Sequence, residues 1–594
     1  MKNLNLYFIL FTLFGSTQKA VLMAQNRSFE EKNGSVAVEA EHFSSEMADS
    51  VRRWYVFSEK ETPLTQSVIT HGVTVLPDGD DNHAATASGK AYLEILPDTR
   101  RTHSDSLRQG VNFTDKAGLI AVLTYKIWFN DTGKYYVWVR AYSTGSEDNG
   151  IHVGIDNQWV ETGKRMQWCD GKNAWTWDSK QRTQKNHCGE AERIFLQVNT
   201  VGWHTIHFSM REDGFEFDKF VLSKKYEKPE GEGGVEVLSK RTSYFDYQNP
   251  IKYGIDSNGL RDCQILRDGD WWYMTGTSYP HWARQETKEN LNKGVVLYRS
   301  KDLTHWSFVK WIVPRGDSTK WYYRRFWAPE IQKIKGKYYA LFNCNNDLTG
   351  HIGQHTGYAV SDKIDGDYKI VTEKHPLSNG NDLTFFEDTD GKVWAFWNKG
   401  RDFGIGFAQI DVEKGIFLTN PQTAIQPAKV DYAKGEKGDT LKVAGYDGRL
   451  IPKVAKYYDW DAIGIEGAYI IKEKDTYYLF YSSWTRGYEI GYATAKNITG
   501  PWTKSPNNPF YGAQNPQTCE KNGLPFTGDP KNPFNQVGHN EIFKGVDGRY
   551  WLSCHGIQKE GVPFLVIDPI DFDEKGNILK SNPSFTKQTV LIKQ

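Results

Sequence analysis

A turn followed by a strand of paired aromatic residues recurs five times in the C-terminal part of this 594-residue chain. Each copy places a tight turn before a segment whose alternate residues are large and apolar, as in a strand packed between two sheets. The copies are DGDWWYMTGT from residue 268, IKGKYYALFN from 334, DGKVWAFWN from 390, EKDTYYLFYSS from 473 and DGRYWLSCHG from 547. Their irregular spacing disfavours a β-helix, and a sandwich needs fewer copies. The repeat therefore predicts a five-bladed β-propeller.

The N-terminal part of the chain has a different, non-repeating β pattern. It begins near VAVEAEHFS at residue 36 and closes near FEFDKFVLSK at 215, with alternating strands between. This pattern predicts a β-sandwich of the jelly-roll or galactose-binding-like kind over residues 27–225. The segment 226–234, YEKPEGEGG, lacks apolar periodicity and is expected to be a linker. The fold class is thus all-β, with the propeller over residues 235–594.

The first residues have the pattern of an export signal. Lys2 precedes an apolar stretch, and small and polar residues lead to Ala24, so residues 1–24 are expected to be a cleaved signal peptide. No Cys occurs before Cys169, which leaves no thiol for a lipid anchor at that cleavage site. A secreted or periplasmic protein is expected. There Cys169 and Cys188 are close enough to form a disulfide, whereas Cys263, Cys344 and Cys554 are expected to be buried thiols.

The balance of charged residues argues against highly charged partners. Lys plus Arg and Asp plus Glu number 73 each, so there is no electrostatic reason to expect nucleic acid or an anionic membrane. No long apolar run follows the signal-like segment, so no membrane span is expected. Aromatic residues reach 14%, and their faces suit sugar rings, although β-rich cores also use them. An uncharged oligo- or polysaccharide and a monomeric protein are expected.

Three carboxylates stand before different copies of the repeat. Asp262, Asp382 and Glu466 each precede a turn by six to eleven residues and are followed by an apolar strand, so we interpret them as equivalent positions. A propeller gathers such positions around one axial pocket. Hydrolysis of an acetal needs one carboxyl group as acid and a carboxylate on the other face of the sugar, and a third would raise the pKa of the acid. The alternative is that each residue only bonds turn amides or a surface cation.

Taken together, these motifs resemble glycoside hydrolase family 43 over roughly residues 245 to 580. The resemblance rests on RDCQI, WAPEI at 327–331, NDLTFFEDTDGKVW, IEGAYIIKEKDTYYLFYSS and GHNEIFKGVDGRYW. It implies a five-bladed propeller and inverting hydrolysis, with Asp262 as general base, Asp382 as pKa modulator and Glu466 as general acid. The chain departs from the family where Cys263 and Leu383 replace the usual prolines, which weakens assignment to a subfamily.

Further residues are candidates for contact with the sugar. Trp327 and Glu330 lie in WAPEI, although Glu330 can equally support its blade. Arg486 can bond a hydroxyl, and Trp484 beside it can stack on a ring. His539 precedes the fifth repeat in the same way as the three acids. Similar proteins place a His there, sometimes linked to calcium, so we expect no required cofactor and consider calcium near His539 a candidate.

The N-terminal unit resembles carbohydrate-binding β-sandwich modules at its two ends. Trp168, Trp175 and Trp177 lie in one loop with Cys169 and form either a sugar platform or a cover for the sandwich. A structural domain that binds nothing is an equal alternative.

The sequence therefore predicts a secreted glycoside hydrolase acting on plant or algal polysaccharide, as an α-L-arabinofuranosidase or β-xylosidase. The alternatives are a β-galactosidase or galactanase of the same fold, and a non-catalytic sugar-binding propeller.

Overall fold

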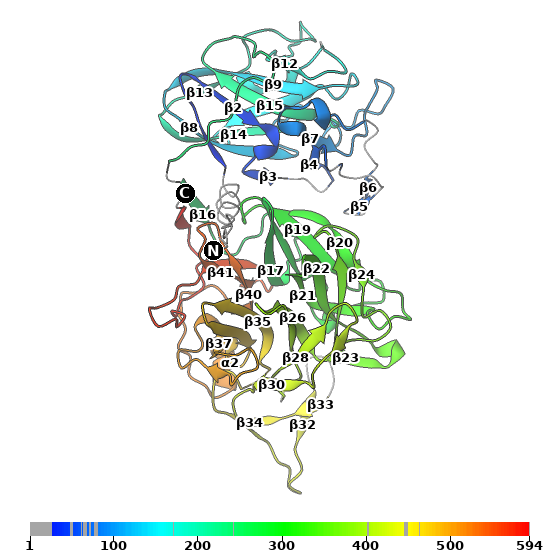
Figure 1. Cartoon of the computed structure of the whole chain (residues 1–594), viewed down its shortest axis with the longest axis vertical. Helices are drawn as coiled ribbons and strands as arrows, with labels where there is room; N and C mark the ends of the chain where they lie inside the picture. The colour runs from blue at the N-terminus through cyan, green and yellow to red at the C-terminus, as the bar shows by residue number, and fades with distance from the viewer. Residues whose placement is uncertain are drawn as a thin grey trace, which may run out of the picture. The chain divides into compact units, whose positions relative to one another are not determined.

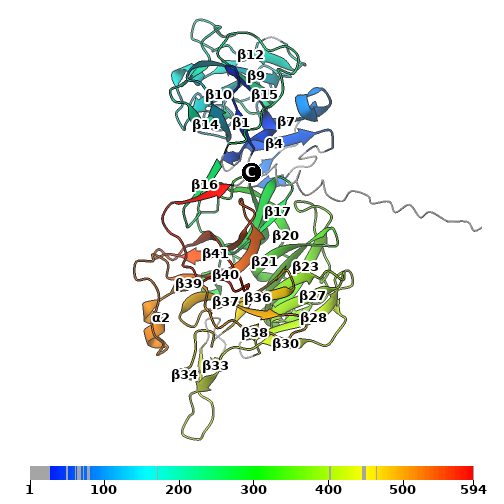
Figure 2. The same cartoon turned by 60° about the vertical axis from the view of Figure 1, so that its left-hand side comes forward.

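The computed structural model describes residues 27–47, 51–60, 62, 68–70, 73–75, 81–169, 171–241, 243–400, 403–444, 450–462 and 464–592. The chain divides into two compact units, of which the first ends at Thr242 and the second begins at Ser243 (Figures 1 and 2). Almost every regular element is a strand, so the predicted all-β class is confirmed. The predicted signal peptide lies outside the described residues.

The first unit is a sandwich of two sheets, of which one is mixed, through the parallel pair of β1 and β8, and the other is antiparallel. One sheet has the order β1 (Ser28–Glu30), β8 (Val122–Phe129), β14 (Gly202–Met210), β10 (Gly150–Ile155) and β11 (Met166–Gln167), with β3 (Ser45–Met47) paired to β8. The other has the order β12 (Thr176–Asp178), β9 (Gly133–Tyr142), β15 (Glu216–Ser223), β7 (Ala91–Leu96) and β4 (Arg53–Ser58), with β13 (Phe195–Val198) on β9 and β2 (Ser35–Glu39) on β15. A small hairpin, β5 (Val68–Thr70) and β6 (Val73–Val75), stands apart.

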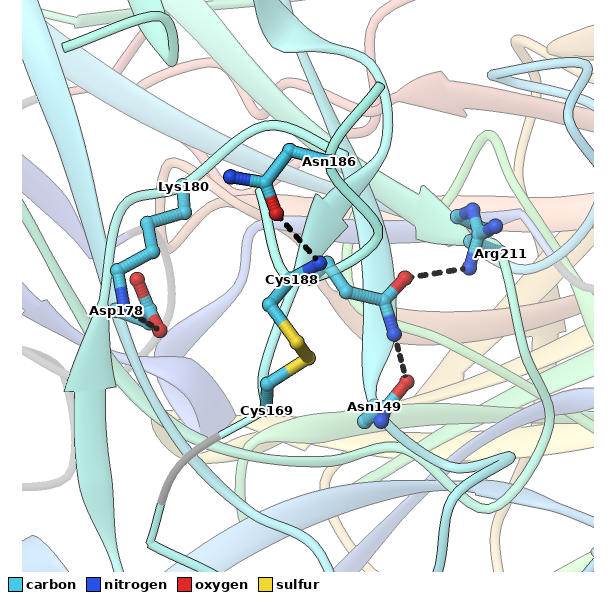
Figure 3. Close-up of a disulfide and its surroundings, with 8 residues drawn as sticks. Asn149, Cys169, Asp178, Lys180, Asn186, Cys188 and Arg211 are labelled. Atoms are coloured by element: carbon cyan, nitrogen blue, oxygen red, sulfur yellow. Dashed lines mark hydrogen bonds and ion pairs between the residues drawn. A yellow bond between two sulfur atoms is a disulfide. The ribbon is translucent and has the colours of Figure 1, made fainter. Parts of the chain in front are cut away.

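A disulfide joins Cys169 to Cys188, as the sequence predicts, with Cα atoms 5.4 Å apart (Figure 3). The side chain of Asn186 accepts a hydrogen bond from the backbone N–H of Cys188, which fixes the second cysteine in its turn. Of the three tryptophans near this loop, Trp168 and Trp177 are buried and Trp175 is half-buried. Because two of the three indoles are covered, this loop closes the sandwich and presents no platform of three rings.

The segment expected to be a linker packs on the sandwich. Lys219 donates to the carbonyl of Gly234, and the indole of Trp177 donates to the carbonyl of Gly231. Further on, the backbone at 237–239 pairs with β1. The first unit therefore extends to Thr242, beyond the boundary near residue 235 inferred from composition. A segment poor in apolar residues can still be ordered when its backbone groups complete a sheet edge.

The second unit is a propeller of five blades, of which blades 4 and 5 are joined into one eight-stranded sheet by a bridge between β39 and β40. Blade 1 has β17 (Arg261–Asp268), β18 (Trp271–Thr277), β19 (Gly294–Ser300) and β20 (Ser307–Pro314). Blade 2 has β21 (Arg324–Ile334), β22 (Lys337–Asn346), β23 (His351–Ser361), β24 (Lys369–Ile370) and β25 (Ser378–Asn379), and blade 3 has β26 (Asn381–Glu387), β27 (Val393–Asn398), β28 (Ile405–Asp411), β29 (Ile416–Phe417) and β30 (Gln422–Ile425). Blade 4 has β35 (Glu466–Glu473), β36 (Thr476–Ser483), β37 (Gly487–Ala495), β38 (Thr503–Lys504) and β39 (Tyr511–Gln514).

Blade 5 closes the ring with both ends of the unit. It contains β40 (Gln536–Lys544), β41 (Tyr550–Ile557) and β42 (Pro563–Pro569). Ile251, from the start of the unit, bridges to Leu565 of β42, and β16 (Ser243–Tyr247) pairs with β43 (Gln588–Ile592). The five predicted repeats form the second strands of the five blades: β18, β22, β27, β36 and β41. Their alternate aromatic residues fill the space between neighbouring sheets.

Two further elements interrupt the blades. Between blades 3 and 4 the chain extends into an arm built from β31 (Val430–Tyr432) paired with β34 (Val454–Tyr457) and β32 (Lys442–Ala444) paired with β33 (Leu450–Pro452) (Figure 1). The short helix α2 (Pro516–Lys521) follows β39. Within the described residues, no helix is both long and apolar enough to cross a membrane.

A chain beginning at residue 235 should fold into the propeller without the sandwich. Each pair of neighbouring blades buries its own apolar cluster, and the closing pair β16–β43 lies wholly within the second unit. A unit with its own core is expected to fold alone. Circular dichroism should report β structure and a cooperative thermal transition. Aggregation of this fragment, with the full chain soluble under the same conditions, would show that the units depend on each other.

Candidate active site

The inner strands of the five blades begin with the same backbone irregularity. In blade 1, Arg261 pairs with Thr277 but the next pair is Gln264 with Thr275, so one extra residue is inserted. The same shift occurs in the other four inner strands. The inserted residues have left-handed φ angles: Asp262 (53°), Ala328 (43°), Asp382 (57°), Gly467 (65°) and His539 (59°). Bulges re-aim side chains, and a left-handed non-glycine residue costs about 1 kcal/mol or more.

This register shows which site residues are truly equivalent. Asp262, Asp382 and His539 occupy the same bulge position in blades 1, 3 and 5, as predicted. Glu466 does not: it stands one residue earlier, and Gly467 takes the bulge position. The prediction that all three acids are equivalent is therefore wrong for Glu466. Its structural counterpart in blade 1 is Arg261, and in blade 2 it is Trp327.

Each bulge leaves a backbone N–H that the sheet does not pair, and a side chain satisfies it. At four of the five junctions the acceptor is a polar residue at the end of the second strand of the preceding blade: Thr277 for Ala328, Asn343 for Asp382, Ser482 for His539 and His555 for Asp262. At the remaining junction the carboxylate of Asp382 itself accepts from Gly467, at 2.8 Å. Because buried N–H groups need partners, these bonds link neighbouring blades at the site.

Asp262 is buried and surrounded by donors and positive charge. The hydroxyl of Thr277 donates to its Oδ2 at 2.6 Å, and a guanidinium nitrogen of Arg261 lies 3.7 Å from Oδ1. Burial alone would raise the pKa of this carboxyl, but the nearby charges of Arg261 and His539 hold it well below its usual value. Asp262 is therefore ionised and able to accept a proton.

Asp382 is held at both of its oxygen atoms. The amide of Asn343 donates to Oδ1 at 2.9 Å, and the N–H of Gly467 donates to Oδ2 at 2.8 Å. The second bond ties this carboxylate to the residue that follows Glu466. Asp382 thus places a negative charge beside Glu466 and also fixes the start of the strand that carries it.

Glu466 has the opposite electrostatic environment from Asp262. The hydroxyl of Tyr488 donates to its Oε1 at 2.7 Å. Burial and the negative charge of Asp382 raise the pKa of Glu466 to about 7, against the lowering effect of His539 and Tyr488. Glu466 is therefore protonated in weakly acidic solution and able to donate a proton.

His539 faces the carboxylates from blade 5. Its Nδ1 lies 3.6 Å from Oδ1 of Asp262 and 4.0 Å from Oδ2 of Asp382. Burial would lower the pKa of the imidazole, but the surrounding carboxylates raise it. Ligand atoms of Asp382, Glu466 and His539 also lie within 4.8 Å of one another, a spacing that suits a cation. The candidate calcium near His539 therefore stays a proposal.

The other predicted residues have different surroundings. Glu330 is buried, accepts from Gln332 and has Glu541 as a second buried carboxyl neighbour, and burial raises its pKa to about 7. These contacts favour a supporting role. Arg486 is also buried, and two of its nitrogens bond the carboxylate of Glu489 at 2.9 and 3.0 Å. The structure thus gives its guanidinium a protein partner, which disfavours the predicted sugar contact.

Trp327 and Trp484 remain open to solvent in part. Trp327 is half-buried at the blade 2 counterpart of Glu466. Trp484 is 39% exposed.

Five residues that contact the three predicted carboxyls were not singled out from the sequence: Arg261, Thr277, Asn343, Tyr488 and His555. Thr277 and His555 lie near the ends of the first and fifth repeat copies, so aligning the copies would have shown polar residues there. Arg261 directly precedes Asp262. Tyr488 has no such signal, because it lies on β37 and reaches Glu466 of β35 across the strand between them.

Comparison with known proteins agrees with this geometry. Residues 247–578, more than half of the chain, match glycosyl hydrolases family 43. The chain belongs to this family. It is therefore a glycoside hydrolase with the family's propeller, as the resemblance of its motifs implied.

Several curated relatives match part of the chain. Uncharacterized protein P23 of Formosa agariphila is 55% identical over 202 residues, which cover 34% of this chain and 46% of that protein. A non-reducing end α-L-arabinofuranosidase of Bacteroides ovatus is 24% identical over 332 residues, 52% of this chain and 48% of the relative. A β-xylosidase of Formosa agariphila is 21% identical, covering 54% and 47%. The chain thus spans about half the length of these relatives.

Among solved structures, a thermostable family-43 glycoside hydrolase aligns with a TM-score of 0.43 and 22% identity, over 58% of this chain and 98% of that one.

Proposed function

We propose that this family 43 member hydrolyses glycosidic bonds by single displacement with inversion. Asp262 acts as general base, Glu466 as general acid and Asp382 as the residue that tunes the acid. The observation that carries this proposal is the separation of the two pKa values. That of Asp262 is held well below its usual range, while that of Glu466 is raised to about 7. Two carboxyl groups whose pKa values differ in this way are suited to act as an acid and base pair.

In the proposed reaction, Asp262 takes a proton from a water molecule, whose oxygen attacks the anomeric carbon. Glu466 gives its proton to the glycosidic oxygen as the bond to the leaving group breaks. The product sugar then has the opposite anomeric configuration. Thr277 and His555 hold the base in place, and Tyr488 stabilises Glu466 as a carboxylate after it has given up its proton.

The proposed substrate is a plant or algal polysaccharide carrying arabinofuranose or xylose, and the protein is proposed to be secreted. Two relatives are named as an α-L-arabinofuranosidase and a β-xylosidase, which supports this choice. A relative from Aspergillus niger is named as a β-D-galactofuranosidase, so galactosides are the second candidate. A screen of aryl arabinofuranosides, xylosides and galactosides tests the proposal. Hydrolysis of none of the three would favour a sugar-binding propeller.

Replacing Asp382 with Asn should move the alkaline limb of the pH–rate profile to lower pH, with an intermediate loss of rate. The general acid must be protonated, so the pKa of Glu466 sets that limb. Without the neighbouring negative charge this pKa should fall, because repulsion no longer disfavours the ionised form. The measurement is kcat/KM of the wild type and the variant across the pH range. Asp388→Asn, at the other end of the blade 3 strand pair, is the control. An unmoved or raised alkaline limb would remove Asp382 from this role.

A further inference from the structure

The end of each blade where the catalytic residues lie is defined by strand direction. Every inner strand starts at its β-bulge and runs away from the site, and the second strand runs back towards the site. The loops that follow the second strands therefore lie at the same end of the propeller as the three carboxyls. Loops at this end of related repeat folds are free to vary, because the sheets below them supply the core.

Two aromatic side chains stand exposed in these loops in neighbouring blades. Phe403, after β27 of blade 3, is 63% exposed, and Trp484, after β36 of blade 4, is 39% exposed. Blades 3 and 4 pack directly against each other through one apolar cluster. Single exposed aromatic residues are common on soluble surfaces, so it is the position of these two relative to Glu466 that matters.

Trp484 lies beside the segment that leads into Glu466. Its neighbour Ser483 bonds the hydroxyl of Thr485, and the amide of Asn522 donates to the carbonyl of Thr485. The indole lies against Gly464, where a Cβ would come 2.5 Å from its Nε1, so this position needs glycine. Ser482 is directly opposite Glu466 in the sheet, and Trp484 is two residues further along, about 7 Å beyond it at the rise of a strand.

The proposed chemistry indicates which part of the substrate lies near Trp484 and Phe403. A general acid must lie next to the glycosidic oxygen, so whatever is bonded to that oxygen lies beyond Glu466, away from Asp262 and its water. Resting on the function proposed above, we infer that the edge formed by Trp484 and Phe403 is the leaving-group subsite, and that it takes a sugar chain. A pocket serving only small leaving groups would have no use for two exposed rings at this edge, whereas sugar rings stack on aromatic faces.

The test compares two substrates that release the same sugar. One is an oligosaccharide of the chain that the wild type degrades, and the other is the corresponding glycosyl fluoride, whose leaving group cannot contact the edge. For Trp484→Ala, the ratio of kcat/KM on the oligosaccharide to kcat/KM on the fluoride should fall about tenfold, the effect of losing one aromatic contact. Phe403→Ala should lower the ratio less, and Trp484→Phe should restore most of it.

Leu348→Ala is the matched control, because Leu348 is an exposed apolar residue in the corresponding loop of blade 2. Its ratio should equal that of the wild type. Equal losses on both substrates for Trp484→Ala, or a fall in ratio for Leu348→Ala, would overturn the subsite.

If the wild type hydrolyses no substrate, the proposed reaction fails but the subsite is still tested. Mobility of the full chain in gels containing arabinoxylan, linear arabinan or galactan then measures binding. Retardation that Trp484→Ala weakens would support the sugar subsite, and unchanged retardation, or none in any gel, would reject it.

Discussion

Replacing Asp262 with Asn should lower kcat/KM at least about a hundredfold on every substrate, because the amide keeps the shape of the side chain but cannot accept a proton. The loss should not depend on the leaving group, since water must be activated in each case. Steady-state kinetics on an aryl glycoside and on an oligosaccharide measures it. The structure supports a large effect: Asp262 is buried, and its pKa is held well below its usual range.

Asp270→Asn provides the control, since Asp270 lies in the turn after the same strand, far from the pocket. That variant should keep wild-type rates. Proton NMR during the first turnovers should show the inverted anomer, and the carboxyl groups of Asp262 and Glu466 should lie roughly 6.5 to 9.5 Å apart to leave room for water. Retention of configuration, or near wild-type activity of Asp262→Asn, would refute the proposed mechanism.

Replacing Glu466 with Gln should slow the release of poor leaving groups far more than that of activated aryl groups. Only a poor leaving group needs protonation as the bond breaks, and general acid catalysis contributes typically about 100- to 10,000-fold. The variant should also lose the alkaline limb of its pH–rate profile, which the wild type owes to the carboxyl whose pKa is about 7. A series of aryl glycosides with graded leaving-group pKa values measures both effects.

Glu473→Gln is the matched control, because Glu473 ends the same strand that Glu466 begins and bonds Tyr550 at the opposite face. It should leave the leaving-group dependence unchanged. If Glu466→Gln slowed all leaving groups equally, Glu466 would be binding or orienting substrate without donating a proton.

Much of the fold can be predicted from the sequence because the same packing of aromatic strands between sheets recurs in each blade. A turn such as Asp268–Asp270 followed by alternating aromatic residues is a local signal, and five copies of it predict five blades. The pairing of Cys169 with Cys188 is also a local matter, since a short loop brings the two together. The C-terminal boundary of the sandwich was harder to predict, because the polar segment before Thr242 is ordered by backbone hydrogen bonds to strands far away in the sequence.

The site was only partly predictable. The sequence placed Asp262, Asp382 and His539 at one position of the repeat, and the structure keeps them there. The one-residue offset of Glu466 depends on where the extra residue of the bulge falls, which spacing cannot reveal. Tyr488 contacts Glu466 from another strand and so belongs to the site, which the sequence did not predict. Arg486 instead bonds Glu489, three residues away, and so does not take the predicted role.

The sequence by itself determined the all-β architecture, the number of blades and the identity of the acidic residues that could act, because these depend on local periodicity and residue chemistry. Only the tertiary structure gives the two carboxyls different surroundings, which lower the pKa of Asp262 and raise that of Glu466. That difference comes from charges brought together across blades: Arg261 and His539 act on Asp262, while Asp382 acts on Glu466. Electrostatic energies depend on distance and burial, and residues far apart in the chain acquire both only when the propeller closes.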